Sequence, residues 1–270
     1  MKKTLISQAV LALSCMAALS GIAQAQTPAP ESSLSYNIGV VSEYRYRGLA
    51  QSRFDPAVQG GVDYADKSGF YVGAWASTIK WIEDNSTTEN PVKGNMELDL
   101  YGGYKFPLGP VAMDVGYLRY QYLNNTLANT GGGGYYKNAN TNEVYVAGTM
   151  GLFTLKYSYA LSDLFGNYNF TDMKSTKGST YLDLNATFDL GNGFSLVPQV
   201  GRQTVKNISV ASYTHYSLTL NKDLGNGLVA NVTYHDTNAN SSFYYVPAAG
   251  PDFNKATGKS AFVLGLKYTF

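Results

Sequence analysis

Two residues that could do covalent chemistry, His215 and Ser217, lie two positions apart and so share one face of any strand they occupy. A serine nucleophile needs a base beside its hydroxyl and a third group that orients the base. Leu218 and Leu220 take the apolar face of the same stretch, and the sequence after Ser217 lacks the Asn-Gly that would suggest an oxyanion-binding neighbour. We therefore predict two ordinary interior polar residues and no catalytic residues, and a lipid hydrolase is the third of three hypotheses.

Charged residues follow a period-two pattern on several predicted strands. Glu43, Arg45 and Arg47 step along one face of a strand predicted over residues 34–46, toward its outer end. Further charges sit in mid-strand opposite apolar rows, at Glu97, Asp99, Lys105, Lys156 and Asp183. If these faces line an enclosed lumen, opposed charges create a transverse field and a constriction that selects solutes by size and polarity. The alternative is a salt-bridge network that simply fills the interior.

Motifs for metals, nucleotides and nucleic acids are missing from the sequence. No cysteine–histidine cluster or spaced carboxylate loop predicts a metal. The glycines at 131–134 lack the strand–glycine–helix context of a phosphate loop, and we interpret them as a loop tip. The chain has 20 basic and 19 acidic residues, and removal of the first two lysines leaves a net charge of −1, so nothing suggests a nucleic-acid partner. We predict no cofactor and no metal.

The N-terminus has the three parts of a secretory signal peptide: a basic start, an apolar run over 5–19, and the site Ala23-Gln24-Ala25. We predict cleavage after Ala25, so that the signal peptide is 1–25, followed by a short periplasmic lead-in over 26–33. A lipoprotein signal that uses Cys15 is disfavoured, because apolar residues continue past it. Cys15 is the only cysteine, so the mature chain has no disulfide and depends on strand pairing and packing.

The remaining chain, 34–270, alternates apolar and polar residues in a succession of short strands. The predicted strands cover residues 34–46, 57–64, 70–79, 95–106, 111–122, 141–150, 153–162, 179–190, 194–203, 213–222, 228–235 and 258–270. Their connections alternate between short turns and long loops, which is the pattern of outer-membrane barrels with short periplasmic turns and long outer loops. We predict one all-β domain, a closed antiparallel transmembrane β-barrel of about 12 strands.

Three positions disturb this pattern. The third strand is apolar on both faces and includes Trp75. Arg119 falls in register with apolar residues, which predicts either a bulge or a place at the outer rim. The rim is favoured, because an arginine costs about 2–4 kcal/mol at the bilayer midplane and about 0–1 near the interface. Pro198 has no N–H to donate to a ladder, so we predict a bulge there as well.

Aromatic residues favour a barrel over a soluble β-sandwich, which is the rival all-β fold. One group lies at the short-turn end of the apolar face, at Tyr104, Phe106, Phe153, Phe188, Phe194, Tyr268 and Phe270. Another lies at the long-loop end, at Tyr44, Tyr46 and Tyr159. Two such belts are expected where an apolar band meets lipid between two aqueous layers. Because an unpaired backbone group in lipid costs several kcal/mol, we also predict that the first strand pairs with the last.

The last strand carries a predicted assembly signal. Its apolar row continues to the C-terminal residue, through Leu264, Leu266, Tyr268 and Phe270. This row is similar to the C-terminal signal that the barrel-assembly machinery of bacterial outer membranes reads. We therefore predict this machinery, outer-membrane lipid and lipopolysaccharide as partners.

The N-terminal third of the mature chain resembles a known family. The stretch over 39–51 reads GVVSEYRYRGLAQ, and the match continues over 56–64 and 68–75. These stretches resemble the TorF-type porins, in which Ser is usual where this chain has Ala50. The resemblance implies a Gram-negative outer-membrane barrel and a solute channel, and it supplies neither a substrate nor catalytic residues.

These observations predict an integral outer-membrane protein that is not an enzyme. The first hypothesis is a porin-like channel for passive diffusion of small hydrophilic solutes, because the charged faces would line its lumen. The second is a structural or surface-interaction barrel whose lumen is plugged. A barrel of about eight strands is filled by side chains and one of about sixteen holds an open channel, so a strand number near twelve leaves both possible.

Overall fold

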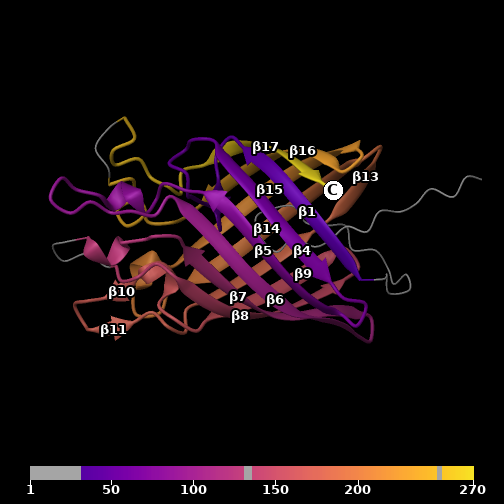
Figure 1. Ribbon diagram of the computed structural model, residues 1–270, viewed down its shortest axis with the longest axis horizontal. Helices are drawn as coiled ribbons and strands as arrows, with labels where there is room; N and C mark the ends of the chain where they lie inside the picture. Colours follow the sequence, from indigo (N-terminus) through magenta and orange to yellow (C-terminus); the bar gives the residue numbers. More distant parts are fainter. Residues whose placement is uncertain (1–31, 131–135, 248–250) are drawn as a thin grey trace, which may run out of the picture.

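One continuous antiparallel sheet closes on itself to form a barrel (Figure 1). The computed structural model describes residues 32–130, 136–247 and 251–270. Its wall strands are β1 (Ser33–Val41), β4 (Ala57–Ala65), β5 (Phe70–Thr78), β6 (Met96–Leu108), β7 (Val111–Tyr122), β8 (Thr141–Met150), β9 (Phe153–Ala160), β12 (Thr180–Ala186), β13 (Phe188–Gly191), β14 (Phe194–Thr204), β15 (Tyr213–Gly225), β16 (Leu228–Thr237) and β17 (Ala261–Thr269). Because β12 and β13 are two parts of one strand, the described barrel has 12 strands, as predicted.

The barrel closes between its first and last strands. Ile38 of β1 lies opposite Tyr268 of β17. Beyond the end of β17, Phe270 exchanges two backbone hydrogen bonds of 2.9 Å with Tyr36. The predicted pairing of the first strand with the last is therefore confirmed. Closure leaves no sheet edge whose N–H and C=O groups would be unpaired in lipid.

The bulges considered at Arg119 and Pro198 are absent. Strands β6, β7 and β8 keep an unbroken register past Arg119, which lies near the outer end of β7 and donates to Gln121 at 2.6 Å and to Asn142 at 3.1 Å. Pro198 pairs with Leu218 in an unbroken register with β15. The hydrogen-bond ladder is interrupted instead on the other side of β14, where its partner strand is divided into β12 and β13. The interruption lies there because the proline nitrogen has no hydrogen to donate to that partner.

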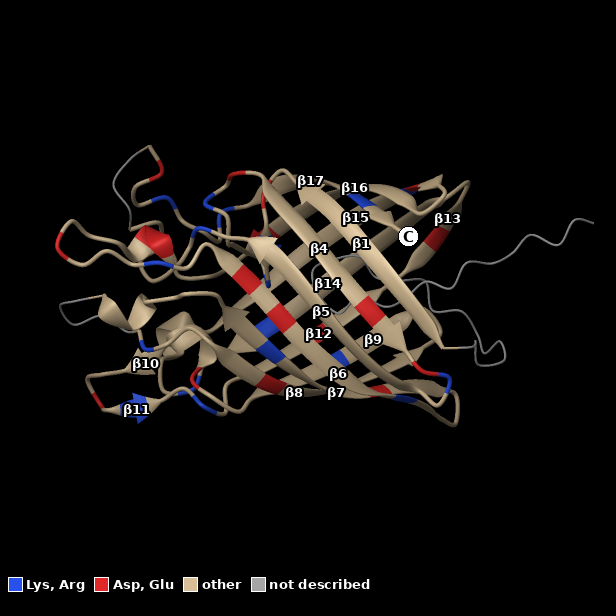
Figure 2. Ribbon diagram, in the orientation of Figure 1, with Lys and Arg blue, Asp and Glu red and all other residues tan. Residues whose placement is uncertain are grey.

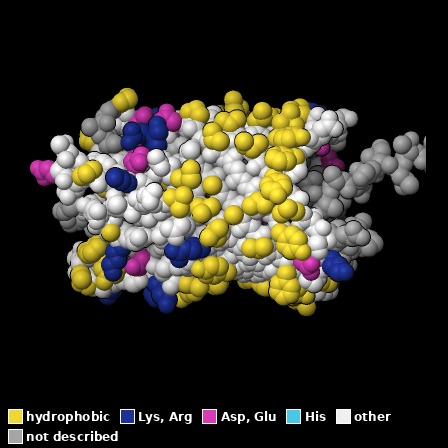
Figure 3. Space-filling view, viewed as in Figure 1, with side chains coloured by type: hydrophobic (Ala, Val, Ile, Leu, Met, Phe, Trp, Pro, Cys, Tyr) yellow, Lys and Arg dark blue, Asp and Glu magenta, His cyan; other side chains and the backbone are white. Residues whose placement is uncertain are grey.

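The outer surface of the barrel is apolar. Figure 3 shows hydrophobic side chains spread over the middle of one face, with charged side chains gathered toward its two ends. Exposed aromatic side chains at the short-turn end include Tyr36, Tyr64, Phe70, Phe153, Phe188, Phe194, Tyr268 and Phe270. At the long-loop end they include Tyr117, Tyr159, Tyr216, Tyr234 and Phe262. Two aromatic belts bound the apolar band, as expected at the two membrane–water interfaces.

Two residues assigned to the outer belt do not belong to it. Tyr44 is only 1% exposed, and Tyr46 packs against Tyr120 with ring centroids 5.6 Å apart. Both face the interior, because β1 ends at Val41 and the chain then turns into the barrel. The predicted strand over 34–46 was therefore too long at its outer end.

The long connections gather at one end of the barrel and the short turns at the other (Figure 1). The long connections contain small elements, namely β2 (Arg45–Tyr46), β3 (Leu49–Ala50), η1 (Glu83–Asn85), η2 (Leu127–Asn129), η3 (Leu164–Gly166), β10 (Tyr168–Asn169), β11 (Lys174–Ser175) and η4 (Ser209–Ala211). None of the helical turns in the described chain is long and apolar enough to cross a membrane. The predicted signal peptide at 1–25, residues 26–31 of the lead-in and the glycines at 131–134 lie outside the described residues.

Candidate functional site

The connection between β1 and β4 folds into the mouth of the barrel. Residues 43–52, which we call the inward hairpin, include the short strands β2 and β3, and these pair Arg45 with Ala50. The side chains predicted to step along the first strand belong to this hairpin: Glu43, Arg45 and Arg47 are 7%, 6% and 8% exposed. The prediction that a wall strand carries them is wrong, because the wall strand ends at Val41.

A two-residue turn makes the inward hairpin possible. Arg47 and Gly48 both have positive φ, 48° and 84°, as the tight hairpin turn with two left-handed residues requires. A Cβ atom at Gly48 would also overlap the side chain of His215 on β15. Glycine is therefore needed both for the backbone conformation and for the close approach to the wall. The Arg47-Gly48 step was the signal in the sequence that could have predicted this hairpin.

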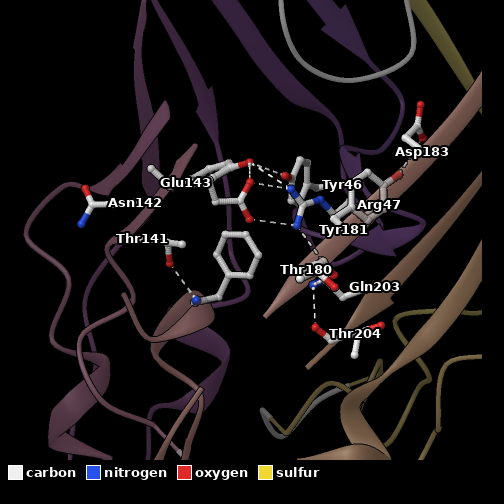
Figure 4. A network of polar contacts seen from close by, with 12 residues as sticks. Tyr46, Arg47, Thr141, Asn142, Glu143, Thr180, Tyr181, Asp183, Gln203 and Thr204 are labelled. Carbon is white, nitrogen blue, oxygen red and sulfur yellow. Dashed lines mark hydrogen bonds and ion pairs between the residues drawn. The ribbon is translucent and has the colours of Figure 1, made fainter. Parts of the chain in front are cut away.

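Arg47 reaches the wall opposite the strand that carries the hairpin (Figure 4). Its guanidinium donates to the two carboxylate oxygens of Glu143 on β8 at 2.7 and 3.1 Å, and to Gln203 on β14 at 2.6 Å. The guanidinium also lies 4.0 Å from the ring centroid of Tyr181 on β12. A bidentate arginine–carboxylate pair fixes orientation as well as position. The hairpin is thus anchored across the lumen.

Sequence reasoning missed Glu143 and Gln203, the partners of Arg47. Glu143 occupies the inward face of β8 opposite the exposed Val144 and Val146, and is 2% exposed. The period-two pattern that selected Glu97 and Asp99 also applies to Glu143. Its role nevertheless depends on a partner from a loop, which strand periodicity does not show.

Glu43 and Arg45 hold the near side of the hairpin. Arg45 Nε donates to Glu43 at 2.7 Å, and its terminal nitrogen donates to the carbonyl of Lys259 at 2.6 Å. Lys259 lies in the connection between β16 and β17, which is adjacent to β1 in the barrel. The two opposite charges therefore neutralise each other, and they do not face one another across the lumen.

Two acids of β6, Glu97 and Asp99, lie inside the barrel beside the hairpin. Glu97 is 1% exposed and accepts a hydrogen bond of 2.9 Å from the hydroxyl of Tyr44. Asp99 is 0% exposed, and its carboxyl group contacts the carboxyl group of Glu97. Two buried carboxyl groups in contact cannot both ionise at low cost, so Glu97 and Asp99 are interpreted as one acid pair.

Tyrosines below the hairpin lie along the wall of the barrel. The ring of Tyr101 occupies the space that a Cβ atom at Gly73 would fill, and its hydroxyl reaches across β5 to donate to Asp63 at 2.5 Å. The same relation to a glycine directly opposite holds for two further pairs, Tyr71 with Gly103 and Tyr145 with Gly116. Because each ring lies over a glycine of the neighbouring strand, these three rings follow the wall instead of crossing the lumen.

The remaining predicted lumen residues, Lys105, Lys156 and Asp183, also face inward. Figure 2 colours the charged positions of the wall strands. The ammonium groups of Lys105 and Lys156 lie 4.6 and 3.8 Å from the ring centroids of Tyr71 and Tyr145. Asp183 lies opposite Lys156 in register and accepts hydrogen bonds from three side chains, Tyr181 at 2.9 Å, Asn185 at 3.0 Å and Gln199 at 2.7 Å.

His215 and Ser217 face inward on β15, but they do not form a nucleophile–base pair. The hydroxyl of Ser217 donates to Gln199 at 2.8 Å. His215 Nε2 lies 2.6 Å from the hydroxyl of Tyr181, and the two rings are stacked with centroids 5.8 Å apart. The geometry therefore assigns Ser217 to a hydrogen-bonded wall network and His215 to a contact with Tyr181.

A cavity of about 430 Å³ opens on the outer side of the inward hairpin. It is lined by the hairpin, by the wall and by the long connections, and we call it the vestibule. Its aromatic lining includes Tyr46, Trp81, Tyr122, Phe165, Tyr213 and Tyr245. Asp84 also lines it and is paired with Arg53. Burial raises the pKa of Asp84, and the arginine opposes that shift.

The arrangement defines the class of protein. A closed barrel with an apolar outer band, two aromatic belts and a polar interior is an integral protein of the bacterial outer membrane. Residues 25–270 match the model of a bacterial protein family of unknown function, Gcw_chp, and the chain belongs to this family. No curated protein matches the chain in sequence.

Solved structures with a similar fold are outer-membrane proteins. The KdgM porin in complex with disordered oligogalacturonate has 8% identity and a TM-score of 0.49, with 88% of this chain and 99% of that chain covered. The NanC porin has 13% identity and a TM-score of 0.49, with the same coverage. Omp33 of Acinetobacter baumannii has 8% identity and a TM-score of 0.46, with 89% and 98% covered. Such low identities do not transfer a solute to this chain.

Proposed function

We propose that the protein is a porin-like channel through which small hydrophilic solutes diffuse across the outer membrane. The observation that carries this proposal is the tyrosine layer below the hairpin, in which Tyr71, Tyr101 and Tyr145 lie over glycines of the neighbouring strand. In a filled barrel, such as one of about eight strands, side chains from opposite walls meet and pack at the centre. The three tyrosine rings follow the wall instead. The resemblance to TorF-type porins supports the same function.

The inward hairpin is the constriction of this proposed channel. Glu43, Arg45 and Arg47 lie in it, and Glu97 and Asp99 lie beside it. The deeper wall carries the other charged residues, Lys105, Lys156 and Asp183. The arginines of the hairpin are paired with Glu43 and Glu143, so the constriction selects solutes mainly by size. The lysines of the deeper wall select solutes by charge below it.

Two partners belong to this proposal. The exposed apolar row that ends at Phe270 is available to the barrel-assembly machinery, as its similarity to known C-terminal signals implies. Lipopolysaccharide would surround the outer belt, since it forms the outer leaflet of such membranes.

A plugged structural barrel is the second candidate, and one observation favours it. The inward hairpin spans the outer lumen and is anchored on the opposite wall through Arg47. A hairpin held this way could block the lumen completely if the remaining gap were narrower than a hydrated solute.

Conductance of the purified mature protein in planar bilayers tests the proposal. A channel gives discrete single-channel steps, and their amplitude decreases when neutral polymers small enough to enter the lumen are added. Insertion is checked independently, by protease protection of the barrel in the same lipid. Inserted protein that gives no steps would overturn the channel and favour the plug.

A further inference from the structure

A basic patch begins on the outside of the barrel, just beyond the outer aromatic belt. Arg202 is exposed on the outward face of β14, because the next residue, Gln203, faces the lumen and accepts from Arg47 at 2.6 Å. Val200, the preceding outward residue, pairs with Tyr216 of the outer belt. Arg202 therefore lies between the belt and the outer connections, at the level where lipid headgroups meet water.

Two lysines extend this patch from neighbouring connections. Lys206 Nζ and the hydroxyl of Tyr159, an outer-belt residue, lie 3.4 and 3.0 Å from the place that a Cβ atom at Gly178 would occupy. The backbone N–H of Lys206 donates to the hydroxyl of Ser179 at 3.0 Å, which holds the connection after β14 against the connection before β12. Lys177, beside Gly178, is exposed as well.

The strand register joins these residues into one patch. Tyr159 of β9 lies opposite Thr180 of β12, and Thr180 lies opposite Thr204 of β14. Thr204 is the next outward residue after Arg202, and Lys206 follows it by two positions. Three cations from one strand and two connections therefore lie close to a single belt tyrosine.

The protein does not neutralise these three cations. Among the described residues, no carboxylate forms an ion pair with any of them, and Arg202 donates only to the hydroxyl of Thr214, at 3.1 Å. The acids of the adjacent connection, Asp163 and Asp172, accept hydrogen bonds from neutral groups instead. A phosphate group can therefore form charge-assisted hydrogen bonds here without displacing a carboxylate.

The barrel surface on the membrane side of the patch is apolar. Leu182 lies directly opposite Arg202 in register and is exposed, as are Leu184 of the same strand and Leu155 and Tyr157 of β9. A ligand would meet cations at its outer end and apolar side chains toward the centre of the bilayer. This order fits an amphiphilic lipid with a phosphorylated headgroup better than a water-soluble anion.

We propose that this patch binds lipopolysaccharide, with its lipid A phosphates on Lys177, Arg202 and Lys206 and its acyl chains along Leu182 and Leu184. The inference rests on the lipopolysaccharide partner of the proposed function and is independent of conduction. The long-loop end faces the leaflet that lipopolysaccharide forms, and cations spread over two connections and a strand suit a headgroup with more than one phosphate.

Native mass spectrometry of the folded mature protein in detergent, with purified lipid A added, tests the inference. We expect Arg202→Gln combined with Lys206→Gln to lower lipid A affinity about 5- to 25-fold, because each cation near an anionic lipid contributes about fivefold. Lys67→Gln combined with Lys93→Gln is the matched control. It removes the same charge from a short turn and from the connection between β5 and β6, and it leaves the affinity unchanged.

Each outcome supports or overturns the proposed site. Unchanged affinity in the Arg202 and Lys206 double variant, or an equal loss in the control, overturns the patch, provided that heat-modifiable gel migration shows folded barrels. Equal affinity for dioleoylphosphatidylglycerol overturns the choice of lipopolysaccharide, and displacement of lipid A by millimolar inorganic phosphate indicates a small-anion site instead. Conductance in bilayers without lipopolysaccharide is measured separately, so a failed channel and a failed lipid site are distinguishable.

Discussion

The shape of the outer mouth depends on single residues with buried charges. Arg47 is the clearest case, because its contacts join a loop that follows β1 to strands on the far side of the barrel. Asp99 is a different case, since its buried carboxyl group contacts that of Glu97, another acid. The two make different predictions, because removing one partner of a buried ion pair is costly, whereas removing one of two like charges in contact is favourable.

Arg47→Ala is expected to release the inward hairpin and to increase single-channel conductance. The loss leaves Glu143 buried without its cation, which for such pairs costs about 3–5 kcal/mol at the site. Glu143→Gln breaks the same pair from the other side and is expected to change conductance in the same direction. Arg119→Ala, which alters an arginine at the rim, is the control and leaves conductance unchanged. Unchanged steps in both lumen variants would show that the hairpin is not the constriction.

Asp99→Asn is expected to stabilise the barrel, because it removes one of two acids in buried contact and its amide can donate to Glu97. Urea titrations of the protein folded into lipid vesicles measure this change. Asp183→Asn is the matched control: Asp183 accepts from Tyr181, Asn185 and Gln199, so the same substitution is destabilising there. Equal effects at the two positions would contradict the difference we assign to their neighbours.

At the scale of elements, short turns and loops fix how the strands are connected. The turn between β4 and β5 begins at Asp66, whose carboxylate accepts from the hydroxyl and the backbone N–H of Ser68, the latter at 2.9 Å. The hydroxyl of Ser32 donates to the other oxygen at 2.8 Å. At the outer end the strands are joined by longer connections. Among these, the inward hairpin is the connection that enters the lumen.

These hydrogen bonds lower the pKa of Asp66 to about 2, with the Ser68 hydroxyl as the main cause. Since the folded pKa lies below the unfolded value of about 3.9, the turn is stabilised above that value and loses the contribution as pH falls through about 2. We expect Ser68→Ala to raise the Asp66 midpoint in a carboxyl NMR titration in micelles. The wild-type protein titrated alongside is the control, and an unmoved midpoint would contradict the assigned cause.

At the scale of the whole molecule, closure depends on the last residue. Phe270 pairs with the backbone of Tyr36, and the two rings stack with centroids 5.7 Å apart. Deleting Phe270 is expected to lower severalfold the amount of folded barrel recovered from outer membranes, because both the seam and the predicted assembly signal are lost. Phe262→Ala, at the outer end of the same row, is the control. An equal loss in the control would show that the terminal position has no special role.

The wall of the barrel could be predicted because the alternation of apolar and polar residues within each strand shows which side chains face outward and which face inward. The ends of β7 and β8 agree with the predicted 111–122 and 141–150, and the alternation of β6 places Glu97, Asp99 and Lys105 inside. The errors lie where a residue's environment comes from elsewhere in the chain. Glu43 and Arg45 alternate like wall residues but belong to a hairpin, and Pro198 interrupts its neighbour instead of its own strand.

The sequence by itself determined a closed barrel of about twelve wall strands with an apolar outer face, because a period of two and alternating loop lengths are local properties. Only the tertiary structure decided what fills the mouth. The inward hairpin and its anchor on Glu143 depend on segments far apart in the chain. Such contacts form only when the sheet closes and brings opposite walls within reach of one arginine side chain.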